Sequence, residues 1–276
     1  MNRKILFLTG TRADFGKIKS LIEILEKTDG FESFVFVTGM HLQHEYGYTL
    51  VEIERSGFKN IHTFENHTDE ATMDLTLART IDGFSAYCKT VNPDLIVVHG
   101  DRVETLAGAI VGSLNNILVA HIEGGEVSGT VDELIRHSVS KLSHVHFVSN
   151  GQAGRRLLQM GETDASLFVI GSPDVDIMFS GNLPSLDTVK SYYEIPYADY
   201  ALAMFHPVTT ESHHMKEYAA NFANALLEDH HRYVIIYPNN DLGSKHILQA
   251  YEQLKDNDRF RIFPSLRFEY FLTLLK

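Results

Sequence analysis

Residues 94–137 decide the fold of this 276-residue chain, and they read DLIVVHGDRVETLAGAIVGSLNNILVAHIEGGEVSGTVDELIRH. The stretch contains two apolar runs typical of buried strands, Asp94–His99 and Ile117–Ile122, each followed by a polar turn that contains glycine. In a parallel sheet the carboxyl ends of neighbouring strands open onto one crevice, where ligands bind. We therefore expect Asp101 and Glu123, which follow the two strands, to face the same pocket.

More ionisable side chains follow the second turn. The start of a predicted helix there carries Asp132, Glu133, Arg136 and His137. Several carboxylates near one pocket suit chemistry that moves protons on and off carbon or a leaving group. The alternative is a structural salt-bridge network in which Arg102 and Arg136 pair with these carboxylates. We interpret the cluster as a candidate active site.

Strand and helix signals alternate along the whole chain, which predicts a doubly wound α/β sheet. Besides the two strands above, strands are predicted at Lys4–Thr9, Phe34–Thr38, Asn60–Phe64, His144–Ser149, Leu167–Ile170, Tyr200–Phe205, Tyr233–Tyr237 and Phe260–Phe263. Helices are predicted at Phe15–Lys27, Gln43–Arg55, Glu70–Thr90, Val103–Leu114, Gln152–Met160, His213–Leu227, Lys245–Leu254 and Phe268–Leu275.

Two domains are predicted. Residues 1–180 form a complete Rossmann-like unit, and a polar Gly/Pro-containing connector leads into a second Rossmann-like unit at residues 181–276. The second unit contains about three strands, whereas paired Rossmann halves are usually of comparable size. We therefore expect the second domain to be truncated.

The composition narrows the class of protein. A net charge of −12 without long Lys/Arg blocks argues against a nucleic-acid or anionic-membrane surface. Hydrophobic residues make up 44% of the chain, but no window approaches the roughly 20 apolar residues of a membrane helix. The single cysteine, Cys88, excludes an internal disulfide, and its helical spacing from Phe84 and Val91 indicates a buried thiol. We expect a soluble, cytoplasmic protein.

The turn Gly10–Lys17 follows the first strand and opens a helix. Backbone N–H groups at a helix N-terminus bind anions, and Arg12 and Lys17 would add positive charge there. The turn matches neither G-x-G-x-x-G nor a Walker motif, which disfavours dinucleotide binding by that route. An ordinary βα turn with surface charges is an equally good interpretation.

The histidines give a weaker signal. The chain contains 15 of them, and their spacings match no zinc motif, so no metal site is expected. His206 differs because it follows a strand where the second unit would face the first, and we expect it to contact substrate.

At these residues the sequence resembles the UDP-N-acetylglucosamine 2-epimerases, specifically the hydrolysing branch of bacterial sialic acid biosynthesis. The matching stretches are TGTRADFGK (9–17), VTGMH (37–41), HGDR (99–102), HIEGGEVSGTVDELIRHSVSKLSH (121–144), IGSPD (170–174), MFHPVTTE (204–211) and YPNND (237–241). The resemblance implies a GT-B fold, in which the substrate lies in the cleft between two Rossmann-like halves. Family members also continue beyond the last residue of this chain, in agreement with the expected truncation.

The resemblance implies a reaction that converts UDP-GlcNAc and water to ManNAc and UDP without a metal or nicotinamide cofactor. Departure of UDP acidifies the hydrogen on C2 of the sugar, and its removal gives a 2-acetamidoglucal intermediate. Water then adds with inversion at C2. Glu123 and Glu133 are the implied acid/base pair, with Asp101 assisting.

Further side chains are implied to bind the substrate. His206, which we count with the catalytic residues, and Arg12 would contact the diphosphate. Arg102 and Arg136 would orient the carboxylates and the sugar. The remaining implied substrate-binding residues are Lys17, Asp132 and, at the uridine, Asn239 and Phe268. A homodimer is expected by analogy.

Three other functions remain open. The same reaction on UDP-2,4-diacetamido-2,4,6-trideoxyglucose, of the legionaminic acid pathway, would use identical catalytic residues. A GT-B glycosyltransferase would share the fold and the UDP-sugar donor but would need an acceptor. A non-catalytic UDP-sugar-binding protein would bind the nucleotide sugar without forming product.

Overall fold

A computed structural model of the protein describes residues 2–67 and 72–276. The chain forms two compact units. Unit 1 comprises the chain up to Leu42 together with Tyr48–Asp176, and unit 2 comprises Gln43–Gly47 together with Ile177–Lys276.

Unit 1 is built on a seven-stranded sheet in which every neighbouring pair of strands is parallel. In spatial order the strands are β3 (Ile61–Thr63), β2 (Phe31–Val37), β1 (Arg3–Thr9), β4 (Leu95–His99), β5 (Leu118–Ile122), β6 (Val145–Val148) and β7 (Leu167–Val169). The predicted doubly wound α/β sheet is confirmed. The strand order reverses between β1 and β4, and this is where ligands bind in such sheets.

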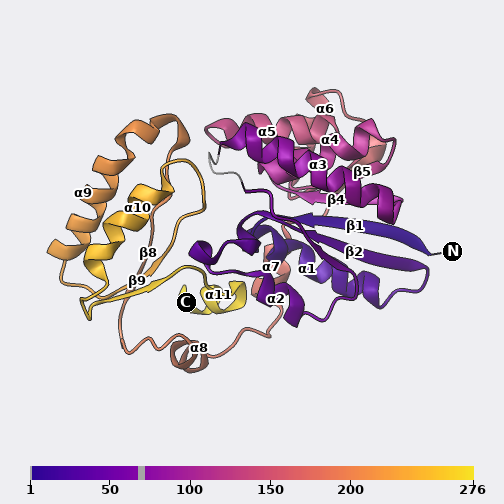
Figure 1. Ribbon diagram of the computed structural model, residues 1–276. Coiled ribbons are helices and arrows are strands. Elements are labelled where there is room, and N and C mark those ends of the chain that lie inside the picture. The colour runs from indigo at the N-terminus through magenta and orange to yellow at the C-terminus, as the bar shows by residue number, and fades with distance from the viewer. Residues whose placement is uncertain (1, 68–71) are drawn as a thin grey trace. The chain divides into compact units, whose positions relative to one another are not determined.

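Helices cover both faces of this sheet (Figure 1). On one face lie α1 (Arg12–Glu26) and α2 (Leu50–Arg55), and on the other lie α3 (Met73–Val91), α4 (Val103–Leu114) and α5 (Val131–Lys141). Successive residues of β1 point to opposite faces, so Ile5 and Phe7 enter the first core while Leu6 and Leu8 enter the second. Unit 1 also contains α6 (Gly151–Gln159), η3 (Asp164–Ser166) and the part of α7 (Pro173–Phe179) up to Asp176.

Small residues bring α4 close to the sheet. A Cβ atom added at Gly112 would overlap Val119 of β5, and one added at Gly108 would lie 2.8 Å from Val98 of β4. Cys88 is buried in the same core, which confirms the predicted packing role of this thiol, and burial raises its pKa to about 12.

Two predicted helices need correction. Helix α1 begins at Arg12, three residues before the predicted start, because Thr11 and Asp14 form a capping box. The predicted helix Gln43–Arg55 is wrong in its first half, where the short 3₁₀ turn η2 (His44–Tyr46) precedes α2. Another 3₁₀ turn, η1 (Gly39–Leu42), ends just before this region. Gly47 ends η2 with a φ of +99°, a conformation that breaks helical periodicity.

The predicted helix Glu70–Thr90 corresponds to α3, and its predicted first residue lies outside the described residues. The αL residue Asn92 ends α3 immediately before Pro93.

Unit 2 contains a three-stranded parallel sheet in the order β10 (Phe260–Phe263), β9 (Tyr233–Ile236) and β8 (Ala201–Met204). The three strands were predicted from the sequence. One face packs against α9 (Met215–Glu228) and α10 (Ser244–Tyr251), and the other against α8 (Leu186–Tyr192) and α11 (Phe268–Leu274). Two 3₁₀ turns, η4 (Thr209–His214) and η5 (Glu252–Leu254), complete the unit. Helices α7 and α8 were not predicted.

The segment Gln43–Gly47 belongs to unit 2 through side-chain contacts. The Tyr46 hydroxyl lies 2.9 Å from that of Ser244, and the Asn240 amide donates a hydrogen bond of 3.2 Å to Gln43. Such pairing across almost two hundred residues has no signature in local sequence.

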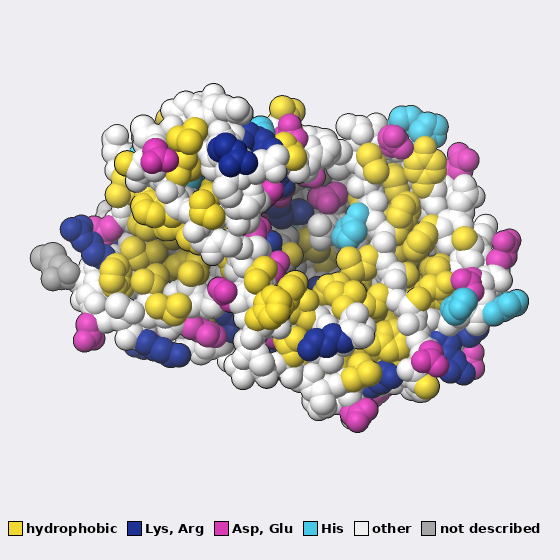
Figure 2. Space-filling view, turned by 180° about the vertical axis from the view of Figure 1, so that it is seen from behind, with side chains coloured by type: hydrophobic (Ala, Val, Ile, Leu, Met, Phe, Trp, Pro, Cys, Tyr) yellow, Lys and Arg dark blue, Asp and Glu magenta, His cyan; other side chains and the backbone are white. Residues whose placement is uncertain are grey.

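In the described part of the chain, every helix is too short or too polar to cross a bilayer. On the face shown in Figure 2, basic and acidic side chains are interspersed over the described surface.

Candidate active site

The strand ends of unit 1 bring the first two predicted residues to neighbouring positions. Strand β4 pairs with β5 so that His99 lies opposite Ile122. Asp101 therefore follows one strand and Glu123 the strand beside it, at the carboxyl edge of the sheet, as predicted.

Glu123 lies at the centre of a polar cluster. Lys17 Nζ lies 2.6 Å and His99 Nε2 2.9 Å from Glu123 Oε2, while the Ser172 hydroxyl donates a hydrogen bond of 2.6 Å to Oε1. The side chains of Lys17 and Glu123 are 19% and 15% exposed, so this ion pair is shielded from much of the solvent. Lys17 also forms an ion pair with Asp174 at 3.2 Å.

The backbone of Glu123 is unusual. Its φ is +61°, in the region that non-glycine residues rarely occupy. Such conformations persist where the surrounding structure enforces them, and they gather at functional sites.

The charges of the cluster shift the pKa values of its members. Burial alone would raise the pKa of Glu123, but the hydrogen bond and charge of His99, with the hydrogen bonds of Lys17 and Ser172, lower it well below its ordinary value. For Lys17, burial is outweighed by the two carboxylates, so its pKa is raised. Glu123 is therefore ionised and Lys17 protonated at neutral pH.

Asp101 belongs to a second cluster, in which Arg136 of α5 pairs with it. Arg136 also donates a hydrogen bond of 2.9 Å to the Ser128 hydroxyl, and the Ser128 backbone N–H donates one of 3.0 Å to Glu133. Burial raises the pKa of Asp101, and the Arg136 charge opposes that shift. The Asp101–Arg136 pair fits both the predicted orienting role of Arg136 and the salt-bridge alternative.

Two other residues on α5 lie beside this second cluster. His137 lies 4.0 Å from Glu133, one turn away on the same helix. The carboxylate of Asp132 accepts a hydrogen bond of 3.1 Å from Thr130.

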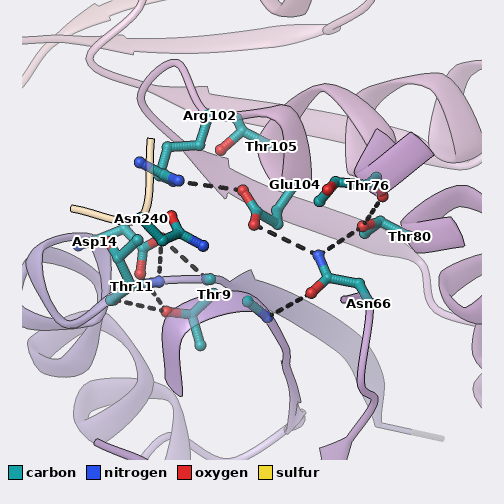
Figure 3. A network of polar contacts seen from close by, with 12 residues as sticks. Thr9, Thr11, Asp14, Asn66, Thr76, Thr80, Arg102, Glu104, Thr105 and Asn240 are labelled. Carbon is teal, nitrogen blue, oxygen red and sulfur yellow. Dashed lines mark hydrogen bonds and ion pairs between the residues drawn. The ribbon is translucent and has the colours of Figure 1, made fainter. Parts of the chain in front are cut away.

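Arg102 belongs to a buried network that the sequence did not reveal (Figure 3). Its Nε lies 3.4 Å from Glu104, whose other oxygen lies 3.4 Å from the Asn66 amide. Asn66 also donates to Thr80 at 2.9 Å and accepts from the Gly39 N–H at 3.1 Å. Glu104 was missed because its only sequence signal is an acidic residue in an apolar helix.

The turn after β1 differs from a simple anion site. The carboxylate of Asp14 accepts the backbone N–H groups of Gly10 at 3.0 Å and Thr11 at 3.1 Å. Two donors that the anion hypothesis assigned to a ligand are therefore used within the protein. Arg12 is the first residue of α1, and Lys17, five residues further along the helix, reaches Glu123.

The remaining predicted site residues lie in unit 2. His206 follows β8, and its Nδ1 accepts a hydrogen bond of 3.3 Å from the Asn239 N–H. Burial lowers the pKa of His206, with Asp241 opposing the shift. Phe268 is the first residue of α11.

Two buried histidines, His121 and His146, form hydrogen bonds or ion pairs within unit 1. His121 is fully buried, with Nε2 2.8 Å from the Gly100 carbonyl and Nδ1 3.1 Å from the Ser140 hydroxyl, and burial lowers its pKa to about 3. His146 is also buried, and its Nε2 lies 3.1 Å from Glu162. Neither was predicted to be a ligand of a metal.

Comparison with known proteins identifies the family. The sequence profile of the UDP-N-acetylglucosamine 2-epimerases matches residues 23–276. The chain belongs to this family. It is 51% identical over 275 residues to a UDP-N-acetylglucosamine 2-epimerase of Neisseria meningitidis, covering 99% of this chain and 72% of the relative. The predicted family resemblance is confirmed.

Two further relatives carry more specific names. A UDP-N,N'-diacetylbacillosamine 2-epimerase (hydrolyzing) of Legionella pneumophila is 33% identical, over 100% of this chain and 74% of its own length. Polysialic acid biosynthesis protein P7 of Escherichia coli is 30% identical, over 99% of this chain and 72% of its own length.

Solved structures of epimerases share the fold of this chain. A UDP-GlcNAc 2-epimerase from Neisseria meningitidis, solved with UDP-GlcNAc, superposes with a TM-score of 0.77 at 19% identity, over 99% of this chain and 75% of that one. The enzyme from Methanocaldococcus jannaschii gives a TM-score of 0.79 at 22% identity, over 98% and 76%. These likenesses confirm the predicted GT-B-like fold class.

Proposed function

We propose that this epimerase-family protein hydrolyses UDP-GlcNAc to ManNAc and UDP with inversion at C2. The observation that carries the proposal is the cluster around Glu123, an ionised carboxylate held by Lys17, His99 and Ser172 at the carboxyl edge of the sheet. The Legionella relative, whose name includes the hydrolysing reaction, supports the hydrolysing chemistry. The E. coli relative supports a role in the biosynthesis of sialic acid or another surface polysaccharide.

The chemistry requires proton transfer on both faces of the sugar. As the bond between C1 and the UDP oxygen breaks, the electron pair leaves with UDP and a base removes the C2 proton, leaving a C1–C2 double bond. Water then adds its oxygen to C1, and a proton reaches C2 from the opposite face. We assign these transfers to Glu123 and Glu133. Asp101, whose carboxylate pairs with Arg136 beside them, assists.

The substrate-binding roles follow from the same hypothesis. Arg12 and His206 contact the diphosphate, and Arg102 and Arg136 orient the sugar and the carboxylates. The other residues proposed to bind substrate are Lys17, Asp132, Asn239 and Phe268. We further propose a cytoplasmic homodimer with domains at residues 1–180 and 181–276.

The direct test incubates the purified protein with UDP-GlcNAc, measures UDP release and identifies the sugar by NMR. We expect free ManNAc. Glu123→Gln and Glu133→Gln should each lower turnover by roughly 10²- to 10⁴-fold, because each removes one acid/base group. Glu54→Gln, on the exposed surface of α2, is the matched control. Light scattering of the same preparation tests the dimer.

Three outcomes would contradict the proposal. Near-normal turnover by both glutamine variants would remove their assigned roles. Formation of UDP-ManNAc in place of free ManNAc would mean that the reaction is not hydrolytic. Product formation only after addition of a sugar acceptor would indicate a glycosyltransferase.

One alternative substrate has specific support. The Legionella relative is named for UDP-N,N'-diacetylbacillosamine. Comparison of kcat/KM for UDP-GlcNAc and this nucleotide sugar decides between them. The higher identity to the Neisseria enzyme leads us to expect preference for UDP-GlcNAc.

A further inference from the structure

The segment Gly171–Asp174 brings two side chains to Glu123 from a distant strand. It follows β7, which is separated from β5 by β6 in the sheet. Gly171 has a φ of +79°, and this turn precedes Pro173, the first residue of α7. Ser172 and Asp174 on either side of the proline both contact the Glu123 cluster.

Ser172 completes the hydrogen bonding of the Glu123 carboxylate. Lys17 and His99 both contact Oε2, and the Ser172 hydroxyl donates to Oε1 at 2.6 Å. With donors on both oxygens, the carboxylate is held in one orientation and its ionised form is stabilised.

Asp174 acts on the other member of the pair. Its carboxylate lies 3.2 Å from Lys17 Nζ, so one ammonium group lies between two carboxylates. Asp174 and Glu123 therefore both form ion pairs with the ammonium group, and two partners fix its position better than one would. Burial raises the pKa of Asp174, and the charge of Lys17 opposes that shift.

We propose that Ser172 and Asp174 are positioning residues for the reaction, with Ser172 orienting the Glu123 carboxylate and Asp174 holding the Lys17 ammonium beside it. The inference rests on the proposed function of Glu123. Neither residue needs to touch the substrate.

The test compares Ser172→Ala and Asp174→Asn with the parent chain. Each variant loses a hydrogen bond to a charged group, so we expect kcat to fall roughly 10- to 100-fold, with little change in KM for Ser172→Ala, whose partner Glu123 is not among the residues proposed to bind substrate. Asp164→Asn and Ser180→Ala, at exposed positions near the two ends of the β7–α7 region, are matched controls and should keep parental kcat.

The pH profile separates positioning from a general loss of structure. Without the Ser172 hydroxyl the pKa of Glu123 rises, so the pH at which activity falls on the acid side moves upward. Without the Asp174 charge the pKa of Lys17 falls, so the alkaline limit moves downward. Both limits stay in place in the control variants.

Two conservative variants provide a further test if Ser172→Ala or Asp174→Asn fails to fold. Ser172→Thr keeps a hydroxyl and Asp174→Glu keeps a carboxylate, so each should recover part of the lost kcat and return its pH limit towards the parental value. Thermal melting of every variant identifies those that are folded.

Two results would overturn the inference. The first is kcat and pH limits in Ser172→Ala and Asp174→Asn that match the controls while Glu123→Gln is inactive. The second is a loss of kcat without any shift of the limits and without recovery in the conservative variants. If Glu123→Gln itself keeps normal turnover, the proposed function fails instead.

Discussion

At residue 123 the backbone adopts a conformation that suits glycine better than glutamate. The φ of +61° places it in the left-handed region, which costs a residue with a Cβ on the order of 1 kcal/mol or more. The cost is tolerated because the conformation presents the carboxylate to Lys17 and His99.

Replacement of this side chain by glycine and by alanine should separate the backbone cost from the lost contacts. Both variants lose the carboxylate, so both should be inactive. Glu123→Gly should nevertheless be more stable than Glu123→Ala by about 1 kcal/mol, measured by urea unfolding. At the exposed helical position Glu54 the order should reverse, because alanine is the better helix former. If the glycine and alanine variants at residue 123 were equally stable, the backbone at this residue would not be strained.

The sequence predicted some residues of the candidate site and missed others for a physical reason. Asp101 and Glu123 could be placed together because parallel strands align their carboxyl ends. Lys17 was expected to add positive charge at an anion site, and the structure pairs it with Glu123, 106 residues away in the chain. Ser172 and Glu104 went unassigned because their contacts are set by packing between distant elements, which leaves no local pattern.

At the scale of elements, helix α4 shows how composition fixes packing. Its predicted bounds, Val103–Leu114, match the observed ones, because its apolar run has clear ends. The bounds of α1 and the Gln43–Arg55 region were harder to predict. A capping box extends α1, and the positive φ of Gly47 interrupts the Gln43–Arg55 region. Both effects depend on backbone geometry, which hydrophobic spacing does not report.

Substitution of Gly112 tests the close approach of α4 to β5. An exposed helical glycine changed to alanine usually gains stability, yet Gly112→Ala should lower the free energy of unfolding by about 1–3 kcal/mol, because its Cβ would overlap Val119. Gly151→Ala, at the start of α6, is the control and should not destabilise, since the nearest atom to its added Cβ is 3.9 Å away. Gain of stability by Gly112→Ala, seen in urea unfolding, would show that α4 can move away from the sheet.

At the scale of the whole molecule, buried neutral histidines make stability depend on pH. His41 and His121 are fully buried, and burial lowers the pKa of each to about 3, against an ordinary value of 6.5. Between these values the unfolded chain binds protons that the folded chain excludes. Stability is therefore complete above about pH 6.5 and is lost as the pH falls towards 3.

We expect the free energy of unfolding to fall by up to about 1.4 kcal/mol per pH unit for each of these histidines between about pH 6 and 4. Asp14 beside His41 opposes part of this trend, because its raised pKa lets the folded chain bind a proton there. His121→Gln should reduce this slope by close to the contribution of one bound proton, about 1.4 kcal/mol per pH unit. The exposed His230→Gln should change the slope much less. An equal slope in the parent and His121→Gln, measured by urea unfolding across this pH range, would contradict the prediction.

The exact division of the chain into two units could not be predicted from the periodicity of the sequence. The alternation of strands and helices predicted the seven-stranded and three-stranded sheets. It gave no sign that Gln43–Gly47 would join unit 2, because that depends on the contacts of Gln43 and Tyr46 with residues near 240.

The buried thiol of Cys88 has a practical consequence for spectroscopy. It is the only cysteine in the chain, it is 4% exposed, and its raised pKa keeps the reactive thiolate scarce. Maleimide or nitroxide reagents applied to the native fold would therefore leave it unmodified. One cysteine introduced on the surface of each unit would then carry a pair of labels without background, and the distance between them could be followed as nucleotide sugar is added.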